Sequence, residues 1–148
     1  MSSGSESGGE GSATLSVLET SIYAGDLEAA ERFYREVLGF TVHSRRAGRH
    51  VFFRVGGGMF LVFNPESTGM AQAEVGGQTA PPHGAAGAGH VAFRIEPSEL
   101  SGWRQRLARY GVAIEAEVEW PRGGRSIYFR DPAGNSLELA PASIWGIS

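Results

Sequence analysis

Three side chains in the sequence, Glu19, His90 and Glu138, could together bind a divalent metal ion. Two carboxylates and one imidazole suit Mn²⁺, Fe²⁺, Zn²⁺ or Ni²⁺, and three protein ligands leave coordination positions open for substrate or water. Such a set is typical of a catalytic metal site. In the alternative interpretation, the two glutamates pair with arginines and His90 is a hydrogen-bonded core histidine.

Arginines are the second kind of side chain with chemistry to offer. Arg54, Arg94 and Arg130 fall on the inner faces of their predicted strands, and Arg122 lies in the loop before the last predicted hairpin. Guanidinium groups bind carboxylates and phosphonates through paired hydrogen bonds, which predicts an anionic substrate. Ion pairs with the two glutamates are the competing use.

The pattern of apolar residues predicts the elements that must position these side chains. Alternating apolar and polar residues predict strands, and apolar residues spaced three and four apart predict two amphipathic helices. The helices begin at Asp26 and Pro97 and end at Gly39 and Gly111. The predicted strands cover residues 15–24, 41–44, 49–55, 59–64, 89–95, 112–119, 126–130 and 136–139.

These elements fall into two units with the same order of one strand, one helix and three strands (βαβββ). The first module covers residues 14–65 and the second covers 88–141, with a connecting loop at 66–87. Residues 1–13, rich in Ser, Gly and Glu, are predicted to be a disordered tail, and 142–148 are a C-terminal tail. The sequence therefore predicts an α+β fold in which two paired modules form a curved mixed sheet around a cavity.

Superposing the two modules explains how the candidate metal ligands could meet. Glu19 lies seven residues before the start of the first helix, and His90 lies seven residues before the start of the second. On the same superposition, Val62 takes the place of Glu138. Equivalent strands of two related modules face one concavity, so the repeat favours a metal site over ion pairs.

The composition narrows the class of protein. With 148 residues, 41% of them hydrophobic, the chain fits one domain or two half-domains with a shared core. It contains no cysteine, so any metal must be bound by His, Asp or Glu, and the cytoplasm is the expected location. A net charge of −3 argues against nucleic-acid binding, and no apolar run approaches the roughly 20 residues of a membrane span.

Three sequence motifs carry a resemblance to a known family. They are the helix signature Asp26-Leu…Ala-Glu-Arg-Phe-Tyr-Arg-Glu-Val-Leu-Gly-Phe, the strand Gly-His90-Val-Ala-Phe and the ending Arg-Asp131-Pro-Ala-Gly-Asn…Leu-Glu138-Leu. Together with the paired modules, they resemble the vicinal oxygen chelate superfamily, which includes glyoxalase I, extradiol dioxygenases, fosfomycin-resistance proteins and bleomycin-binding proteins. The resemblance covers residues 15–140, and the second half is most similar to fosfomycin-resistance proteins.

The resemblance also implies site residues. The metal ligands of the family fall on Glu19, His90 and Glu138, and the first of these positions is commonly histidine in the family. In the epoxide-hydrolysing branch, a catalytic carboxylate stands before an aromatic pair on the third strand, and His50 holds that place here, ahead of Phe52. An imidazole with an ordinary pKa of about 6.5 could serve as the catalytic base.

The pocket implied by the resemblance adds residues that could bind substrate. Ser126 and Tyr128 match positions that line the pocket of fosfomycin-resistance enzymes, and Phe52 shares the face of its strand with His50. His83, in the connecting loop, could belong to a lid or be a fourth ligand, or it could be an exposed loop histidine.

The resemblance implies a metal-dependent enzyme that acts on a small oxygenated, anionic substrate by Lewis-acid catalysis. The expected assembly is a homodimer, in which the site could be shared between subunits. Epoxide opening, lyase or isomerase chemistry and ring cleavage by a dioxygenase stay open as reaction types. A metal-free small-molecule binding protein of the bleomycin-resistance kind is the alternative class.

Overall fold

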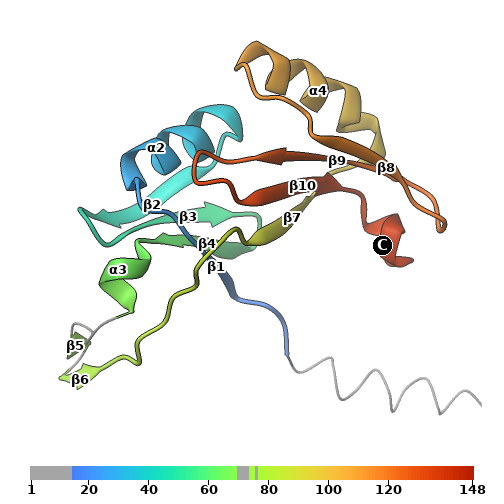
Figure 1. The fold of residues 1–148 in the computed structure, drawn as a ribbon. Coiled ribbons are helices and arrows are strands. Elements are labelled where there is room, and N and C mark those ends of the chain that lie inside the picture. Colours follow the sequence, from blue (N-terminus) through green and yellow to red (C-terminus); the bar gives the residue numbers. More distant parts are fainter. Residues whose placement is uncertain (1–14, 70–73, 76) are drawn as a thin grey trace, which may run out of the picture.

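The computed structural model describes residues 15–69, 74–75 and 77–148, so the predicted tail at 1–13 lies outside the described residues. Two modules follow one another along the chain (Figure 1). The first contains β1 (Glu19–Tyr23), α2 (Leu27–Arg32), β2 (Thr41–Arg46), β3 (His50–Val55) and β4 (Gly58–Phe63). The second contains β7 (His90–Arg94), α4 (Leu100–Arg109), β8 (Ala116–Glu119), β9 (Arg125–Arg130) and β10 (Ser136–Ala140).

Each module forms a four-stranded sheet, and the strand orders are β1-β4-β3-β2 and β7-β10-β9-β8. In both sheets the first strand pairs in parallel with the last, and the other pairs are antiparallel. The same order and directions in both sheets confirm the predicted α+β fold of two βαβββ modules. In the view of Figure 1, α2 and α4 both lie above the sheets.

The strand register corrects one detail of the predicted repeat. The first residues of β1 and β7 pair with Met59 and Ser136, respectively. Two residues further along β10 lies Glu138, and two residues further along β4 lies Leu61. Leu61 therefore takes the place of Glu138, and the assignment of Val62 to that place is wrong. Neighbours in a strand point to opposite faces, and Val62 is buried in the core.

The first helix begins and ends where the sequence predicts, but it widens near its end. The Asp26 carboxylate accepts a 3.0 Å hydrogen bond from the backbone N–H of Ala29, which caps the first turn. A π-helical turn, Phe33–Val37, follows directly, and Gly39 ends the helix with a φ of 77°. A 3₁₀ turn, Pro97–Glu99, leads directly into α4, so the second helical segment begins at Pro97, where the sequence predicts a helix start.

The two modules share one hydrophobic core. The ring centroid of Phe33, which follows α2, lies 6.4 Å from that of Phe129 in β9. The buried hydroxyl of Tyr34 donates a 2.6 Å hydrogen bond to the Asp131 carboxylate. Burial raises the pKa of Tyr34 and the charge of Asp131 raises it further, so the phenol stays protonated. Asn135 donates to Asp131 and to the backbone of β1, which ties the β9–β10 turn to the first module.

The connecting loop contains more regular structure than its composition predicts. It includes a short helix, α3 (Pro65–Thr68), and the paired two-residue strands β5 (Glu74–Val75) and β6 (Gln78–Thr79). The C-terminal tail forms a 3₁₀ turn at Ala142–Trp145. Elements this short leave no apolar period in a sequence. Among the described residues, no helix has the length and apolarity needed to cross a membrane.

Candidate metal centre and its surroundings

The second module brings His90 and Glu138 together. His90 begins β7, and Glu138 lies on the neighbouring strand β10, opposite Ala92. Both side chains lie on the face turned away from the core, because the strand neighbours Leu137 and Leu139 are buried in the core. Nε2 of His90 is 3.3 Å from Oε1 of Glu138. The Glu138 residue is only 4% exposed, whereas the His90 side chain is half exposed.

The hydrogen bonds of this pair leave a place for a cation. Nδ1 of His90 is 3.0 Å from the backbone carbonyl oxygen of Ser136. A carbonyl only accepts, so Nδ1 carries a proton, and in the neutral tautomer of the ring Nε2 is then an acceptor that faces a carboxylate and can bind a cation. The other oxygen of Glu138, Oε2, is buried and has no hydrogen-bond partner among the described residues. Two facing acceptors and an unpartnered carboxylate oxygen fit a metal ion, and we refer to His90 and Glu138 as the candidate metal centre.

Two hydroxyl groups lie behind this centre. Tyr128 pairs with Glu138 across β9 and β10, and its ring stacks on that of His90 at a centroid distance of 6.0 Å. Burial raises the pKa of Tyr128, the contact with Glu138 raises it further, and a contact with Ser126 lowers it. Ser126 is fully buried, and its Oγ accepts a 2.8 Å hydrogen bond from the indole N–H of Trp120. Ser126 is therefore a buried neighbour of Tyr128.

Glu19, the third predicted ligand, lies apart from the candidate metal centre. It is exposed at the start of β1. Together with residues such as Ala92, it lines a cleft of about 170 Å³ between the edges of β1 and β7. Within the described part of one chain, no three His, Asp or Glu side chains form a group that could hold a metal. One chain thus joins two of the three predicted ligands and leaves the third on the other module.

The arginines predicted to bind substrate divide into two kinds. Arg130 donates a 2.7 Å hydrogen bond to the Glu115 carboxylate, and Arg94 donates to the backbone oxygen of the last residue at 3.3 Å. Arg54 and Arg122 form no ion pair with any residue that the structure describes. The charges of Arg54 and Arg122 are therefore available to an anion, whereas that of Arg130 is compensated within the chain.

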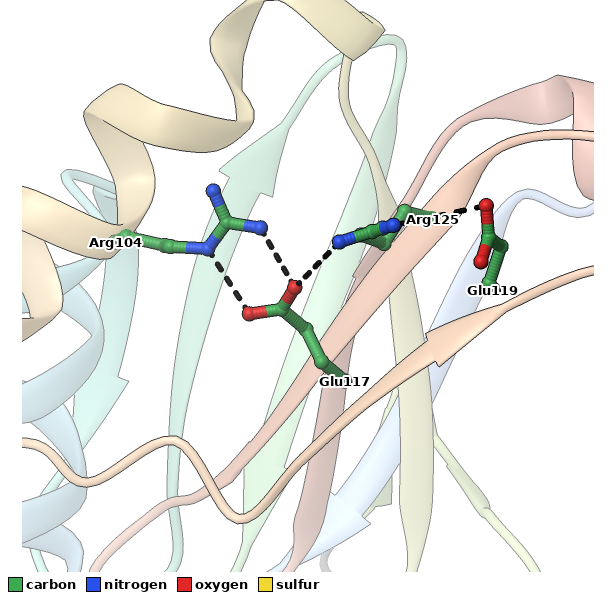
Figure 2. A network of polar contacts seen from close by, with 4 residues as sticks. All are labelled: Arg104, Glu117, Glu119 and Arg125. Carbon is green, nitrogen blue, oxygen red and sulfur yellow. Dashed lines mark hydrogen bonds and ion pairs between the residues drawn. The ribbon is translucent and has the colours of Figure 1, made fainter.

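A separate group of charges joins α4 to the outer strand of the second sheet (Figure 2). Arg104 donates two hydrogen bonds to the Glu117 carboxylate, at 3.0 and 2.7 Å. Arg125 lies 3.4 Å from the same carboxylate and 3.6 Å from Glu119. The hydrogen bonds from Arg104 lower the pKa of Glu117. Because these side chains are largely exposed, the network stabilises α4 only modestly, and it adds no residue to the candidate metal centre.

His50 lies on the open face of the first sheet, as the strand pattern predicts. It shares that face with Phe52 and Arg54, while Val51 and Phe53 are buried in the core on the opposite face. The rings of His50 and Phe52 stack at a centroid distance of 3.9 Å.

Burial and two neighbouring arginines keep His50 neutral. Nη1 of Arg49 is 2.6 Å from Nδ1 of His50. A guanidinium only donates, so Nδ1 accepts this bond and Nε2 carries the proton of the neutral ring. Burial lowers the pKa of His50, and the charges of Arg49 and Arg46 lower it further. In this arrangement His50 is a hydrogen-bond donor, and the predicted role as a base would require the contact with Arg49 to break.

The lowered pKa of His50 predicts a pH dependence of stability. As the pH falls below about 6.5, His50 of the unfolded chain binds a proton before His50 of the folded protein does. The free energy of unfolding therefore decreases as the pH falls from about 6.5 to the lower pKa of the folded state. Between about pH 7.5 and pH 5, wild type is expected to lose more free energy of unfolding than His50→Gln. Urea unfolding at both pH values measures the difference, and His43→Gln, at an exposed ring, is the control. Equal losses in wild type and His50→Gln would contradict the lowered pKa.

Comparison with known proteins agrees with the fold of two paired modules. The sequence profile of the Glyoxalase/Bleomycin resistance protein/Dioxygenase superfamily matches residues 16–139. Lactoylglutathione lyase from Agrobacterium tumefaciens, whose crystal structure is known, is 39% identical in sequence to this chain. The superposition covers 89% of this chain and 97% of the lyase chain, with a TM-score of 0.83.

Two further proteins are similar, one over part of its sequence and one in its fold. The metallothiol transferase FosB of Shouchella clausii is 44% identical over 54 residues, which are 34% of this chain and 36% of FosB. The matched segment thus spans about a third of the length of the curated relatives. The fosfomycin resistance protein FosX from Listeria monocytogenes shares the fold, with 20% identity, a TM-score of 0.62 and coverage of 86% and 93% of the two chains. This chain belongs to the Glyoxalase/Bleomycin resistance protein/Dioxygenase superfamily.

Proposed function

We propose that this protein is a divalent-metal-dependent enzyme that acts on a small, oxygenated and anionic substrate. The observation that carries the proposal is the arrangement of His90 and Glu138. An imidazole nitrogen, an acceptor in the tautomer that donates to Ser136, lies 3.3 Å from a carboxylate oxygen, and the second carboxylate oxygen is buried with no hydrogen-bond partner in the described part of the chain. Burying a charge in this way is costly unless a cation compensates it.

We further propose that the third ligand is Glu19 from a second copy of the chain. Glu19 is exposed, and among the described residues of one chain it belongs to no group of three side chains that could hold a metal. A two-fold pair of chains would place the same two faces against each other twice, and would therefore make two equivalent sites. One imidazole and two carboxylates suit Mn²⁺ or Fe²⁺ in particular, while Zn²⁺ and Ni²⁺ stay possible ions for this site.

The residues of the chain have separable roles in this proposal. The bound metal would supply Lewis-acid polarisation of a substrate oxygen. The Ser136 carbonyl holds the His90 ring by its Nδ1–H, and Tyr128 supports the Glu138 carboxylate. Arg54 offers an uncompensated guanidinium to the anionic group of the substrate. Epoxide opening, a lyase or isomerase reaction, and ring cleavage are the reaction types to be distinguished by substrate screening.

Calorimetric titration of the metal-stripped protein with Mn²⁺, Fe²⁺, Zn²⁺ and Ni²⁺ tests this function. Wild type is expected to bind one ion per chain, and Glu19→Gln to bind at least about 100-fold more weakly. Loss of a direct ligand costs more than the roughly 10- to 100-fold loss of affinity caused by removing a group that only orients a ligand. Glu28→Gln, at an exposed residue of α2, is the control and should bind like wild type. A wild type that binds none of these ions would contradict the proposal and favour a metal-free binding protein.

A further inference from the structure

The open face of the first sheet carries a row of four paired side chains, one on each strand, and three of them are aromatic rings. Tyr23 in β1 pairs with Phe63 in β4, Phe63 pairs with His50 in β3, and His50 pairs with Arg46 in β2. Residues that pair across a sheet share one face, so these side chains stand side by side on the face opposite the core.

Phe63 is the centre of this row. Four rings have centroids between 4.6 and 6.3 Å from the centroid of Phe63, and they come from two strands, β1 and β3, and the connecting loop. The Tyr23 hydroxyl also lies 2.7 Å from Nδ1 of His83, and this hydrogen bond holds the connecting loop against the sheet. We refer to the five as the aromatic platform: Tyr23, His50, Phe52, Phe63 and His83.

The aromatic platform is not part of the hydrophobic core. The core side of this sheet is formed by residues such as Val51 and Val62, which point away from the platform. Yet β4 is buried on both faces, since Leu61 and Phe63 on the open face are 6% and 5% exposed. The consecutive apolar residues of β4 are typical of a strand that is covered on both sides. On the strands beside it, the rings of Tyr23, His50 and Phe52 remain partly exposed. These partly exposed rings can stack on a planar ligand.

Positive charge surrounds the aromatic platform. Arg46 ends the row, and Arg54 lies on the same strand face two residues from Phe52. Neither arginine forms an ion pair with a residue in the described ranges. The Arg49 guanidinium lies 5.5 Å from the centroid of Phe63 and donates to His50, whose Nε2–H is then a further donor. This electrostatic environment attracts anions and repels cations.

We infer that the substrate is a flat aromatic or conjugated anion, such as an arene carboxylate, rather than a small aliphatic one. This inference rests on the proposed function, and it adds the substrate class. Stacked and edge-to-face rings favour a planar ligand, and guanidinium and imidazole N–H groups at the margin favour a carboxylate. The open face of the first module, which also carries Glu19, binds the ring, and the metal site that this Glu19 completes with His90 and Glu138 of the second copy acts on the oxygen-bearing part of the substrate.

The test compares two carboxylates of matched size, 2-naphthoate and its saturated counterpart decahydro-2-naphthoate, by calorimetry on the Mn²⁺-loaded protein. Wild type is expected to bind the aromatic anion about 3- to 10-fold more tightly, the range that ring–ring contacts provide. Phe52→Leu keeps an apolar side chain without the ring and is expected to abolish the preference. Arg54→Gln should weaken both ligands equally, and 2-naphthylmethylammonium should not bind.

Each outcome bears on one claim. Equal affinities for the two carboxylates, or no binding of either, would overturn the inference. A preference that survives in Phe52→Leu would also overturn it. Titration of the same samples with Mn²⁺ separates the two proposals, because metal binding without an aromatic preference refutes only the substrate class. An aromatic preference without metal binding refutes only the metal-dependent function.

Discussion

Replacing Glu138 with glutamine is expected to abolish tight metal binding while it stabilises the metal-free protein. Glutamine has the same shape as glutamate and no charge, so the buried, unpartnered oxygen at this position no longer carries a charge that needs compensation. The amide N–H of glutamine can also donate to the unprotonated Nε2 of His90, which lies 3.3 Å from Oε1 in wild type. We expect the free energy of unfolding in EDTA to rise by about 1 kcal/mol and the Mn²⁺ affinity to fall at least about 100-fold.

Urea unfolding of wild type and Glu138→Gln, each with EDTA and with Mn²⁺, measures both effects. Metal should stabilise wild type, because it binds only the folded state, and should leave the variant unchanged. Glu115→Gln is the matched control, since Glu115 is exposed and paired with Arg130 and should show neither effect on metal binding nor a gain in stability. A variant that is less stable than wild type in EDTA would show that a proton on His90, and not a metal ion, compensates Glu138.

Replacing Asp131 with alanine is expected to be the most destabilising single substitution at the junction of the modules. The buried carboxylate accepts hydrogen bonds from the Tyr34 hydroxyl at 2.6 Å, the Asn135 amide at 3.0 Å, and the backbone N–H groups of Ala133 and Asn135 at 2.9 Å each. Without it, the buried phenol loses its acceptor and the β9–β10 turn loses its internal bonds. The expected loss in free energy of unfolding is about 3–5 kcal/mol.

Tyr34→Phe is the matched control for Asp131→Ala. It removes only the bond from the phenol and leaves Asp131 with its other donors, so the expected loss is about 1–2 kcal/mol. Urea unfolding followed by tryptophan fluorescence measures both variants at neutral pH. If Asp131→Ala cost no more than Tyr34→Phe, the carboxylate would not be the element that ties the turn to the first module.

The sequence predicts the architecture well, because architecture depends on local periodicity. Alternating residues located the strands to within a few positions, and the repeat of one βαβββ unit predicted the identical order of the two sheets. The π-helical turn at Phe33–Val37 could not be predicted, because it does not change the spacing of the apolar stripe enough to be read. The displacement from Val62 to Leu61 is an error of one residue in the register of β4, and such an error moves a side chain to the opposite face of the sheet.

The site was predicted less completely, because contacts between side chains depend on tertiary structure. Strand periodicity placed His50 and Phe52 on one face, but it could not show that Arg49 occupies Nδ1 of the imidazole. The hydrogen bond from the Trp120 indole to Ser126 depends on a turn that reverses the chain after Trp120. The backbone N–H of Trp120 closes this turn with a 3.0 Å hydrogen bond to the backbone oxygen of Gly124. The placement of His83 on Phe63 involves a loop whose path leaves no pattern in the sequence.

The most direct test of the central claim mixes two variants that are each incomplete at the site. Chains with Glu19→Ala and chains with His90→Ala should separately bind no Mn²⁺ tightly. After reversible dissociation and mixing in equal amounts, half of the pairs are mixed and each mixed pair holds one complete site, so about a quarter of the wild-type sites should return. Calorimetry at equal total concentration measures this recovery. Wild-type binding by Glu19→Ala alone, or no recovery on mixing, would contradict a metal site shared between two copies of the chain.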